Sequence, residues 1–238
     1  SHDRPPRAPR AAAALLPPRQ KPGGLAERPP GGAGRGRGGG GRMGLAGARR
    51  WAFAGALGAF HTSELAYAAA FTSHDFGWHS LLLSPPYAVA MALAVAEEAV
   101  WAWAAPGLKA SGTVTDAVAA VGLGMVVMGE LLRKGALLSA RGNFTHTIQH
   151  TRRKGHVLVT SGFYRLCRHP GYLGWWIWAV GTQVLLLNPA CSVLFHLLSR
   201  QFFSARVQAE EALLLRFFGQ AFEEYADCTP HYMPLRRA

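Results

Sequence analysis

The sequence HVLVTSGFYRLCRHPGYLG, residues 156–174, lies between apolar stretches but is itself rich in polar and small residues. It contains two histidines, two tyrosines, two arginines and three glycines, one of which follows Pro170. Chains that cross membranes seldom place so many polar groups beside hydrocarbon without a functional reason. We therefore treat this stretch as the candidate binding site and work outward to the segments that hold it.

The composition of the whole chain favours a membrane protein. Half of the 238 residues are hydrophobic and only 16% are charged, whereas a soluble domain carries about a quarter charged residues. The formal net charge is +12, and residues 1–44 alone contain nine lysines or arginines and two acidic residues.

The first 44 residues are low in complexity, with runs such as LLPPRQKPGG and GRGRGGGGR. Proline and glycine at this density predict a disordered basic tail, followed by one membrane domain over residues 45–238. An RNA-associated protein that acts through this Gly/Arg tail is one alternative, although we expect no nucleic-acid partner.

Three apolar segments are each long enough to cross a bilayer, which takes about 20 residues. The third contains Gly122, Gly124 and Gly129, small residues that let a neighbouring helix approach closely. The predicted spans cover about 49–71, 81–103 and 113–138.

Several polar residues interrupt these spans. His61 and Glu64 lie three apart and therefore share one helix face, which we expect to look into a helical bundle. Glu130 precedes Arg133 and Lys134 by three and four residues, which predicts a local ion pair.

Beyond the central stretch, residues 173–203 are apolar but are divided by Asn188 and Pro189, a turn signal. Each arm is shorter than a full span, so the pair predicts a helical hairpin that enters and leaves on the same side. Residues 204–226 are amphipathic and predict a C-terminal helix along the membrane surface. Within the central stretch, VLVTSGFY predicts a short strand-like piece that ends at Gly162.

Basic residues assign the sides of the membrane. Arg141, Arg152, Arg153 and Lys154 place the loop over residues 139–172 in the cytoplasm. Three spans then put the basic tail on the opposite side, against the same rule. Either an upstream helix outside this sequence or a tail that is absent from the mature protein would resolve the conflict.

Several kinds of chemistry are disfavoured. His146 and His150 have helical spacing, but the segment reads HTIQH and lacks the glutamate of a zinc protease. The three cysteines are widely spaced, so we expect no metal site. Neither GxSxG nor GxGxxG occurs, which argues against a serine hydrolase and a Rossmann cofactor site. A polar pocket at the membrane surface remains, formed by the 149–172 loop and a helix carrying Arg206 and Glu210.

Six motifs relate the chain to a known family. In order they are FHTSE, GELLRK, GNFTH, HVLVTSGFYRLCRHPGYLGW, GTQVLLLNP and RVQAEEALLLRFFG, the last followed by EEY. Together they resemble the isoprenylcysteine carboxyl methyltransferase family. The resemblance implies an all-α integral membrane protein, a multi-span helical bundle with a helical hairpin and a cytosolic cofactor pocket. It also implies methyl transfer from S-adenosylmethionine to the C-terminal carboxylate of prenylated cysteine in CaaX-processed, small-GTPase-like proteins at the endoplasmic reticulum membrane.

The resemblance assigns roles residue by residue. Arg206 would be the catalytic, substrate-binding arginine. Gly171 stands where the family often has serine, which removes a hydroxyl but keeps the backbone. The implied cofactor-binding residues are Gln149, His156, Val157, Leu158, Val159, Tyr164, His169, Pro170, Gly171, Tyr172 and Glu210.

Two further alternatives stay open on the sequence. The RHPxY pattern also occurs in other membrane methyltransferases, so a phospholipid N-methyltransferase of the phosphatidylethanolamine type is one. A non-catalytic membrane scaffold is the other.

Overall fold

The computed structural model describes residues 39–72, 76–110, 112–152 and 154–233. These lie in the second of two compact units, Gly38–Ala238; the first unit, and with it most of the predicted tail, lies outside the described residues. The elements are α1 (Gly39–Phe71), η2 (Trp78–Leu81), α2 (Pro85–Ala104), α3 (Thr113–Ala140), η3 (Arg141–Asn143), η4 (Gly162–Arg165), α4 (Pro170–Leu185), α5 (Pro189–Phe218) and α6 (Gln220–Cys228).

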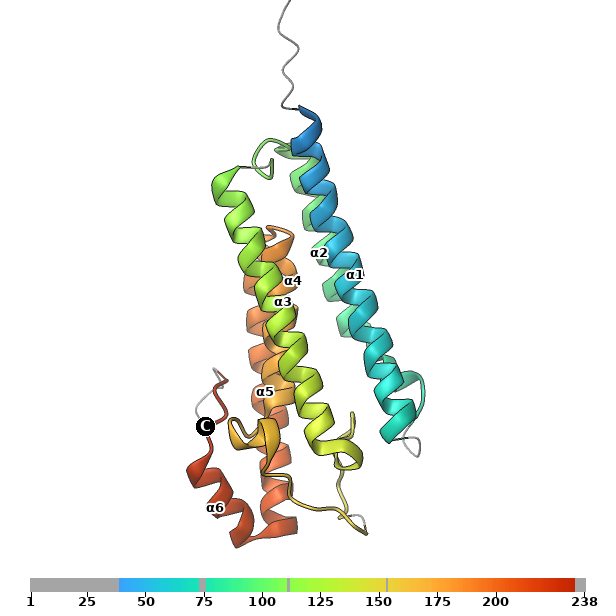
Figure 1. Ribbon diagram of the computed structural model, residues 1–238, viewed down its shortest axis with the longest axis vertical. Coiled ribbons are helices and arrows are strands. Elements are labelled where there is room, and N and C mark those ends of the chain that lie inside the picture. The colour runs from blue at the N-terminus through green and yellow to red at the C-terminus, as the bar shows by residue number, and fades with distance from the viewer. Residues whose placement is uncertain (1–38, 73–75, 111, 153, 234–238) are drawn as a thin grey trace, which may run out of the picture. The chain divides into compact units, whose positions relative to one another are not determined.

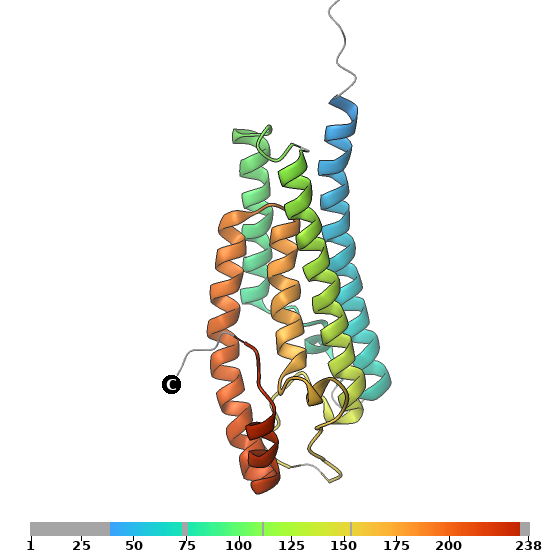
Figure 2. The ribbon, with the colours of Figure 1, turned by 60° about the vertical axis from the view of Figure 1, so that its left-hand side comes forward.

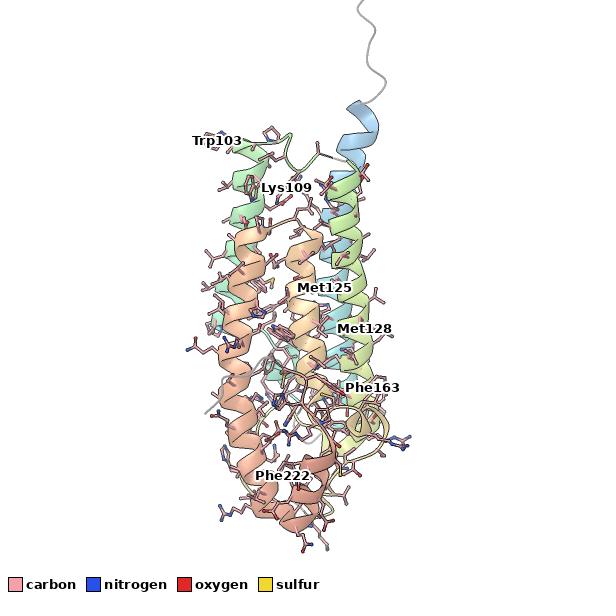
Figure 3. The ribbon with its side chains drawn as sticks, turned by 90° about the vertical axis from the view of Figure 1, so that its left-hand side faces the viewer. Trp103, Lys109, Met125, Met128, Phe163 and Phe222 are labelled. Atoms are coloured by element: carbon pink, nitrogen blue, oxygen red, sulfur yellow. The ribbon has the colours of Figure 1, made fainter. Side chains whose placement is uncertain are left out.

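The long helices of this unit form an antiparallel bundle (Figures 1 and 2). The α1–α2 connection, the irregular segment between α3 and α4, and α6 lie at one end, which we call the site end. The α2–α3 loop and the tight α4–α5 turn lie at the other, the far end. Lys109 marks the far end in Figure 3, and Phe163 and Phe222 mark the site end. The described residues contain helices and no strand, which confirms the all-helical prediction for this part of the chain.

Helices α3 and α4 make the most extensive contact in the bundle. A Cβ atom added to Gly122 would lie 2.2 Å from the backbone nitrogen of Leu185, and one added to Gly129 would lie 2.5 Å from that of Trp178. Gly124, in contrast, faces open space. The small-residue prediction therefore holds for two of the three glycines, which let the two backbones touch.

The core lies where α1, α3, α4 and α5 converge. Trp178 is almost fully buried and stacks on Phe60 of α1 with 4.2 Å between the ring centroids. Val126 of α3 and Phe195 of α5 belong to the same cluster. Large aromatic rings stacked in this way contribute much of a core's apolar burial.

Apolar side chains also cover the outside of α2 and α3. Val89, Val95, Val121 and Val127 are each more than half exposed. Two helical segments of the described chain, residues 78–104 and 113–143, are long and apolar enough to cross a membrane. They correspond to the second and third predicted spans. The predicted first span, in α1, is not one of these two segments, because the polar run HTSE interrupts its apolar sequence.

Helix boundaries differ from the prediction in two places. The predicted disordered tail extends to residue 44, but α1 already begins at Gly39. The predicted boundary between hairpin and amphipathic helix, near residues 203 and 204, is absent, and α5 runs unbroken to Phe218. No glycine or proline interrupts this helix before Gly219, whose φ of 54° ends it and starts α6.

The strand-like piece predicted from VLVTSGFY is also wrong. Residues 156–160 have no regular secondary structure, and η4 follows at Gly162. The backbone N–H of Val157 donates to a side-chain oxygen, Oδ1 of Asn143, at 3.1 Å, and not to a neighbouring strand. Gly162 has a φ of 61°, a conformation that favours glycine.

Candidate functional site

Two cavities lie side by side towards the site end of the bundle. The loop cavity, of about 110 Å³, lies between the irregular segment that follows α3, the first turn of α4 and the last turns of α5. The helix cavity, of about 690 Å³, lies between η2 and α2 on one side and α4 and α5 on the other. Phe144, Thr145 and Tyr172 line both cavities, so the two spaces meet at these residues.

The loop cavity gathers almost every residue that the sequence assigned to cofactor binding. Pro170 is the exception, since it is fully buried and begins α4 beneath the cavity. The residues assigned to the cofactor that do line the cavity are Gln149, His156, Val157, Leu158, Val159, Tyr164, His169, Gly171, Tyr172 and Glu210.

Arg206 lines the helix cavity instead. Most of that cavity's wall is apolar, and Trp175 of α4 and Phe195 of α5 both line it and belong to or pack against the core. Along α5, Arg206 and Phe195 are separated by eleven residues, or roughly 16 Å at the rise of an α-helix. The cationic group of Arg206 therefore stands at one end of a long apolar space, which Arg133 also lines.

Tyr172 stands between the two cavities and links their charged groups. Its hydroxyl donates to the carboxylate of Glu210 on the loop-cavity side. It accepts from Nε of Arg206 at 2.8 Å on the helix-cavity side. Arg206 and Glu210 lie four residues apart on α5, the spacing of a helical ion pair, but the phenol of Tyr172 bonds to both of them.

The guanidinium of Arg206 is held on several sides. Besides Tyr172, its Nη2 donates to the backbone oxygen of His146 at 2.7 Å. The group also lies over the rings of Tyr172 and Phe202, 5.4 Å and 6.0 Å from their centroids. These contacts fix the plane of the fork, which is what two-pronged binding of a carboxylate requires.

His169 is oriented by a partner that the sequence analysis missed. Its Nε2–H donates to Glu211 at 2.8 Å, and Arg168 lies 3.3 Å from the same carboxylate oxygen. Burial by itself would raise the pKa of the Glu211 carboxyl, but the His169 hydrogen bond and the charges of His169 and Arg168 outweigh it and lower that pKa. The ring of His169 stacks on Tyr172 with an interplanar angle of 7°.

The C-terminal part of the chain fastens the same segment from outside. Tyr225 of α6 donates from its hydroxyl to the backbone oxygen of Tyr164 at 2.7 Å. The backbone N–H of Arg168 donates to Pro230 at 3.0 Å. Burial and the negative charge of Glu210 raise the pKa of Tyr164, so its phenol stays protonated. The EEY motif thus contributes Tyr225, to which the sequence analysis gave no role.

The chain was compared with known proteins. Residues 121–216 match the isoprenylcysteine carboxyl methyltransferase (ICMT) family. A probable protein-S-isoprenylcysteine O-methyltransferase of Oryza sativa subsp. indica is 47% identical over 177 residues, which are 74% of this chain and 91% of the rice protein. The chain belongs to the isoprenylcysteine carboxyl methyltransferase family.

Two further relatives agree with this membership. Protein-S-isoprenylcysteine O-methyltransferase B of Arabidopsis thaliana is 41% identical over 176 residues, 74% of this chain and 87% of that protein. The solved structure of the eukaryotic intramembrane Ras methyltransferase ICMT has a TM-score of 0.75 and 33% sequence identity, covering 80% of this chain and 67% of its own. The family predicted from the six motifs is confirmed, and with it the methyltransferase class.

The stretch that matches the family model runs from α3 to α5, so it includes most of the wall of the loop cavity. The motif GNFTH lies inside it and was used only to identify the family. The structure gives its residues positions: Asn143 holds Val157, while Phe144 and Thr145 line both cavities. Their place in a shared motif was the signal that could have identified them as site residues.

Proposed function

We propose that the chain transfers a methyl group from S-adenosylmethionine to the C-terminal carboxylate of a prenylated cysteine. The observation that carries this proposal is the meeting of the two cavities at Tyr172, with Glu210 on one side and Arg206 on the other. A water-soluble donor fits the loop cavity, and a lipid-modified acceptor fits the helix cavity.

The residues of the loop cavity suit the donor. It is lined by Glu210, Tyr164 and residues 156–159. A carboxylate offsets the positive charge of a sulfonium, and aromatic walls suit both that cation and an adenine ring. When bound, S-adenosylmethionine supplies an electrophilic methyl group. Glu210, Tyr164, His169 and Tyr172 would hold it.

Arg206 would bind the acceptor carboxylate. A C-terminal carboxyl group has a pKa of about 3.5 and is already ionised at neutral pH, so its methylation needs no general base. The work left to the protein is to hold the two reactants in line and to exclude water, for which effective molarity supplies about 7–11 kcal/mol. The anchored guanidinium supports this role.

The prenyl group would occupy the apolar length of the helix cavity. Leu83, Leu198 and Phe202 line it and are also exposed on the outside of the bundle. In a membrane these side chains face lipid tails, so a prenyl group could pass between bilayer and cavity without crossing water. CaaX-processed proteins of the small-GTPase type, which end in such a cysteine, are the proposed partners.

We further propose a multi-pass protein of the endoplasmic reticulum membrane whose site end faces the cytosol. The three spans lie in α1, α2 and α3, and α4 with the first half of α5 forms the same-side hairpin. Arg141, Arg152 and Lys154 at the site end are exposed, as the positive-inside rule expects of a cytosolic face.

The test uses the full chain in lipid vesicles with radiolabelled S-adenosylmethionine. One sample receives N-acetyl-farnesylcysteine and the other phosphatidylethanolamine. The proposal expects label on the farnesylcysteine alone, as a base-labile ester. Label on the phospholipid amine alone would establish the N-methyltransferase alternative, and folded protein that binds no donor would establish the scaffold.

A further inference from the structure

Glu64 is a fully buried carboxylate that lines neither cavity. It lies on α1, outside the stretch of residues 121–216 that matches the family. An isolated buried carboxylate would cost several kcal/mol. Its partners therefore decide what it does.

Three basic side chains surround Glu64. Arg133 makes a two-pronged contact, from Nε at 3.0 Å and Nη2 at 2.9 Å. Lys134 donates at 2.6 Å and His146 at 2.8 Å. We call these four residues the site-end cluster. The local pair predicted for Glu130 forms with Lys134 at 3.4 Å, whereas Arg133 turns away from Glu130 and binds Glu64 on α1.

The first connection from the cluster runs to the donor side. Nη1 of Arg133 donates to the backbone oxygen of Gly171 at 3.2 Å. The same guanidinium lies 5.0 Å from the ring centroid of Phe144. Gly171 and Phe144 both line the loop cavity. Because Glu64 occupies the other edge of this guanidinium, it determines where Nη1 can point.

The second connection runs to the acceptor side. The side chain of His146 is fixed by Glu64, and the backbone oxygen of the same residue accepts from Nη2 of Arg206 at 2.7 Å. Moving His146 therefore moves a hydrogen-bond acceptor of Arg206. Through one carboxylate, α1 reaches a residue on each side of the junction between the cavities.

We propose that Glu64 is a positioning residue for methyl transfer, which sets Arg206 through His146 and the first turn of α4 through Arg133. This inference rests on the proposed function, because it assigns Arg206 and the loop cavity to the two reactants. A misplacement of about 1 Å at a reacting centre lowers a rate by about a hundredfold. Glu64 does not line the helix cavity, and the apolar side chains that would hold the prenyl group keep their places, so substrate binding should change little.

The experiment compares Glu64→Gln with the matched variant Glu98→Gln in full-length protein in lipid vesicles. Glu98 is also a carboxylate with two basic partners, Arg50 and Lys109, but it lies at the far end and its side chain is 19% exposed. Donor-binding sites are counted by saturation with S-adenosylhomocysteine, and kcat is expressed per binding site. We expect Glu64→Gln to lower kcat about a hundredfold, with KM for N-acetyl-farnesylcysteine within a few-fold. Glu98→Gln should keep both constants.

Two further variants guard against a trivial loss of folding. Glu64→Asp keeps the charge, and we expect it to recover part of the lost kcat. His146→Ala removes the side chain through which Glu64 fixes the backbone acceptor of Arg206 and leaves the Glu64–Arg133 contact in place, so adding it to Glu64→Gln should lower kcat by less than the product of the single effects.

An unchanged kcat per binding site in Glu64→Gln would overturn the inference and leave Glu64 a structural residue. Equal losses in Glu64→Gln and Glu98→Gln would overturn it too. Wild-type protein that fails to methylate farnesylcysteine would instead refute the proposed function, so the two failures are distinguishable.

Discussion

The bundle contains a polar cluster at each end, and the two differ in where their hydrogen bonds lead. In the far-end cluster, Lys109 donates to Glu98, to Oδ1 of Asn188 and to the backbone of the α4–α5 turn. Glu97 of α2 accepts from two backbone N–H groups in the first turn of α5. Apart from the Lys109–Glu98 pair, these bonds end on the α4–α5 turn or on the first turn of α5. This cluster therefore holds the tip of the hairpin in place.

The site-end cluster of Glu64, Arg133, Lys134 and His146 instead leads outward. Its bonds continue to the backbone of Gly171 and to Arg206, which line the two cavities. Both clusters pair carboxylates with basic side chains, although Glu64 is fully buried and the side chain of Glu98 is 19% exposed. Charge pairing by itself therefore does not separate a structural cluster from one that serves a site. The two kinds of cluster are separated by the residues at which their hydrogen bonds end.

The largest effect is expected at Arg206, where the site-end cluster reaches the acceptor. Arg206→Ala should lower kcat by about a hundred- to a thousandfold, as removal of one preorganised charge-stabilising group does. Methylation of N-acetyl-farnesylcysteine measures it. Arg216→Ala, on the exposed last turn of the same helix, is the control and should stay near wild type.

Gly129 should matter to the whole fold, because α3 and α4 make the most extensive contact in the bundle. A Cβ at this position would meet the backbone of α4 at 2.5 Å, so Gly129→Ala should destabilise the fold by about 1–3 kcal/mol. Thermal unfolding in detergent measures the loss. Gly124→Ala, which meets open space, should be neutral or slightly stabilising. Equal losses in the two variants would mean that this close approach is not needed.

The far-end cluster should affect stability without affecting catalysis. Lys109→Ala removes charged hydrogen bonds to Glu98 and the hairpin turn and should cost about 2 kcal/mol of unfolding free energy. KM and kcat per donor-binding site should remain within twofold of wild type, on the order expected for an independent site. A specific fall in kcat would erase the proposed difference between the two ends.

The smallest effect concerns acid pH. The lowered pKa of Glu211 means that its pairing with His169 contributes above the ordinary glutamate value of 4.5 and is lost as pH falls through the lowered one. Wild-type protein should therefore lose more thermal stability between about pH 5 and pH 3 than Glu211→Gln does. Parallel curves for the two proteins would contradict this account.

The sequence was sufficient for much of the fold and most of the candidate site. Periodic apolar runs located the helices, and ordered motifs collected the residues of the loop cavity. It failed where a partner lies far along the chain. Glu130 offered Arg133 a partner three residues away, yet Arg133 binds Glu64, 69 residues away. The same limit hid the phenol of Tyr172 between Arg206 and Glu210, since spacing along one helix says nothing of a side chain from another.

The separation of donor and acceptor across Tyr172 can be measured directly by equilibrium binding to two variants. Glu210→Gln should lose affinity for S-adenosylmethionine, whose sulfonium carries the positive charge that Glu210 would offset, and keep affinity for N-acetyl-farnesylcysteine. Arg206→Ala should do the reverse, with the donor bound as in wild type. Loss of donor binding in Arg206→Ala, or loss of both ligands in either folded variant, would contradict the assignment of one reactant to each cavity.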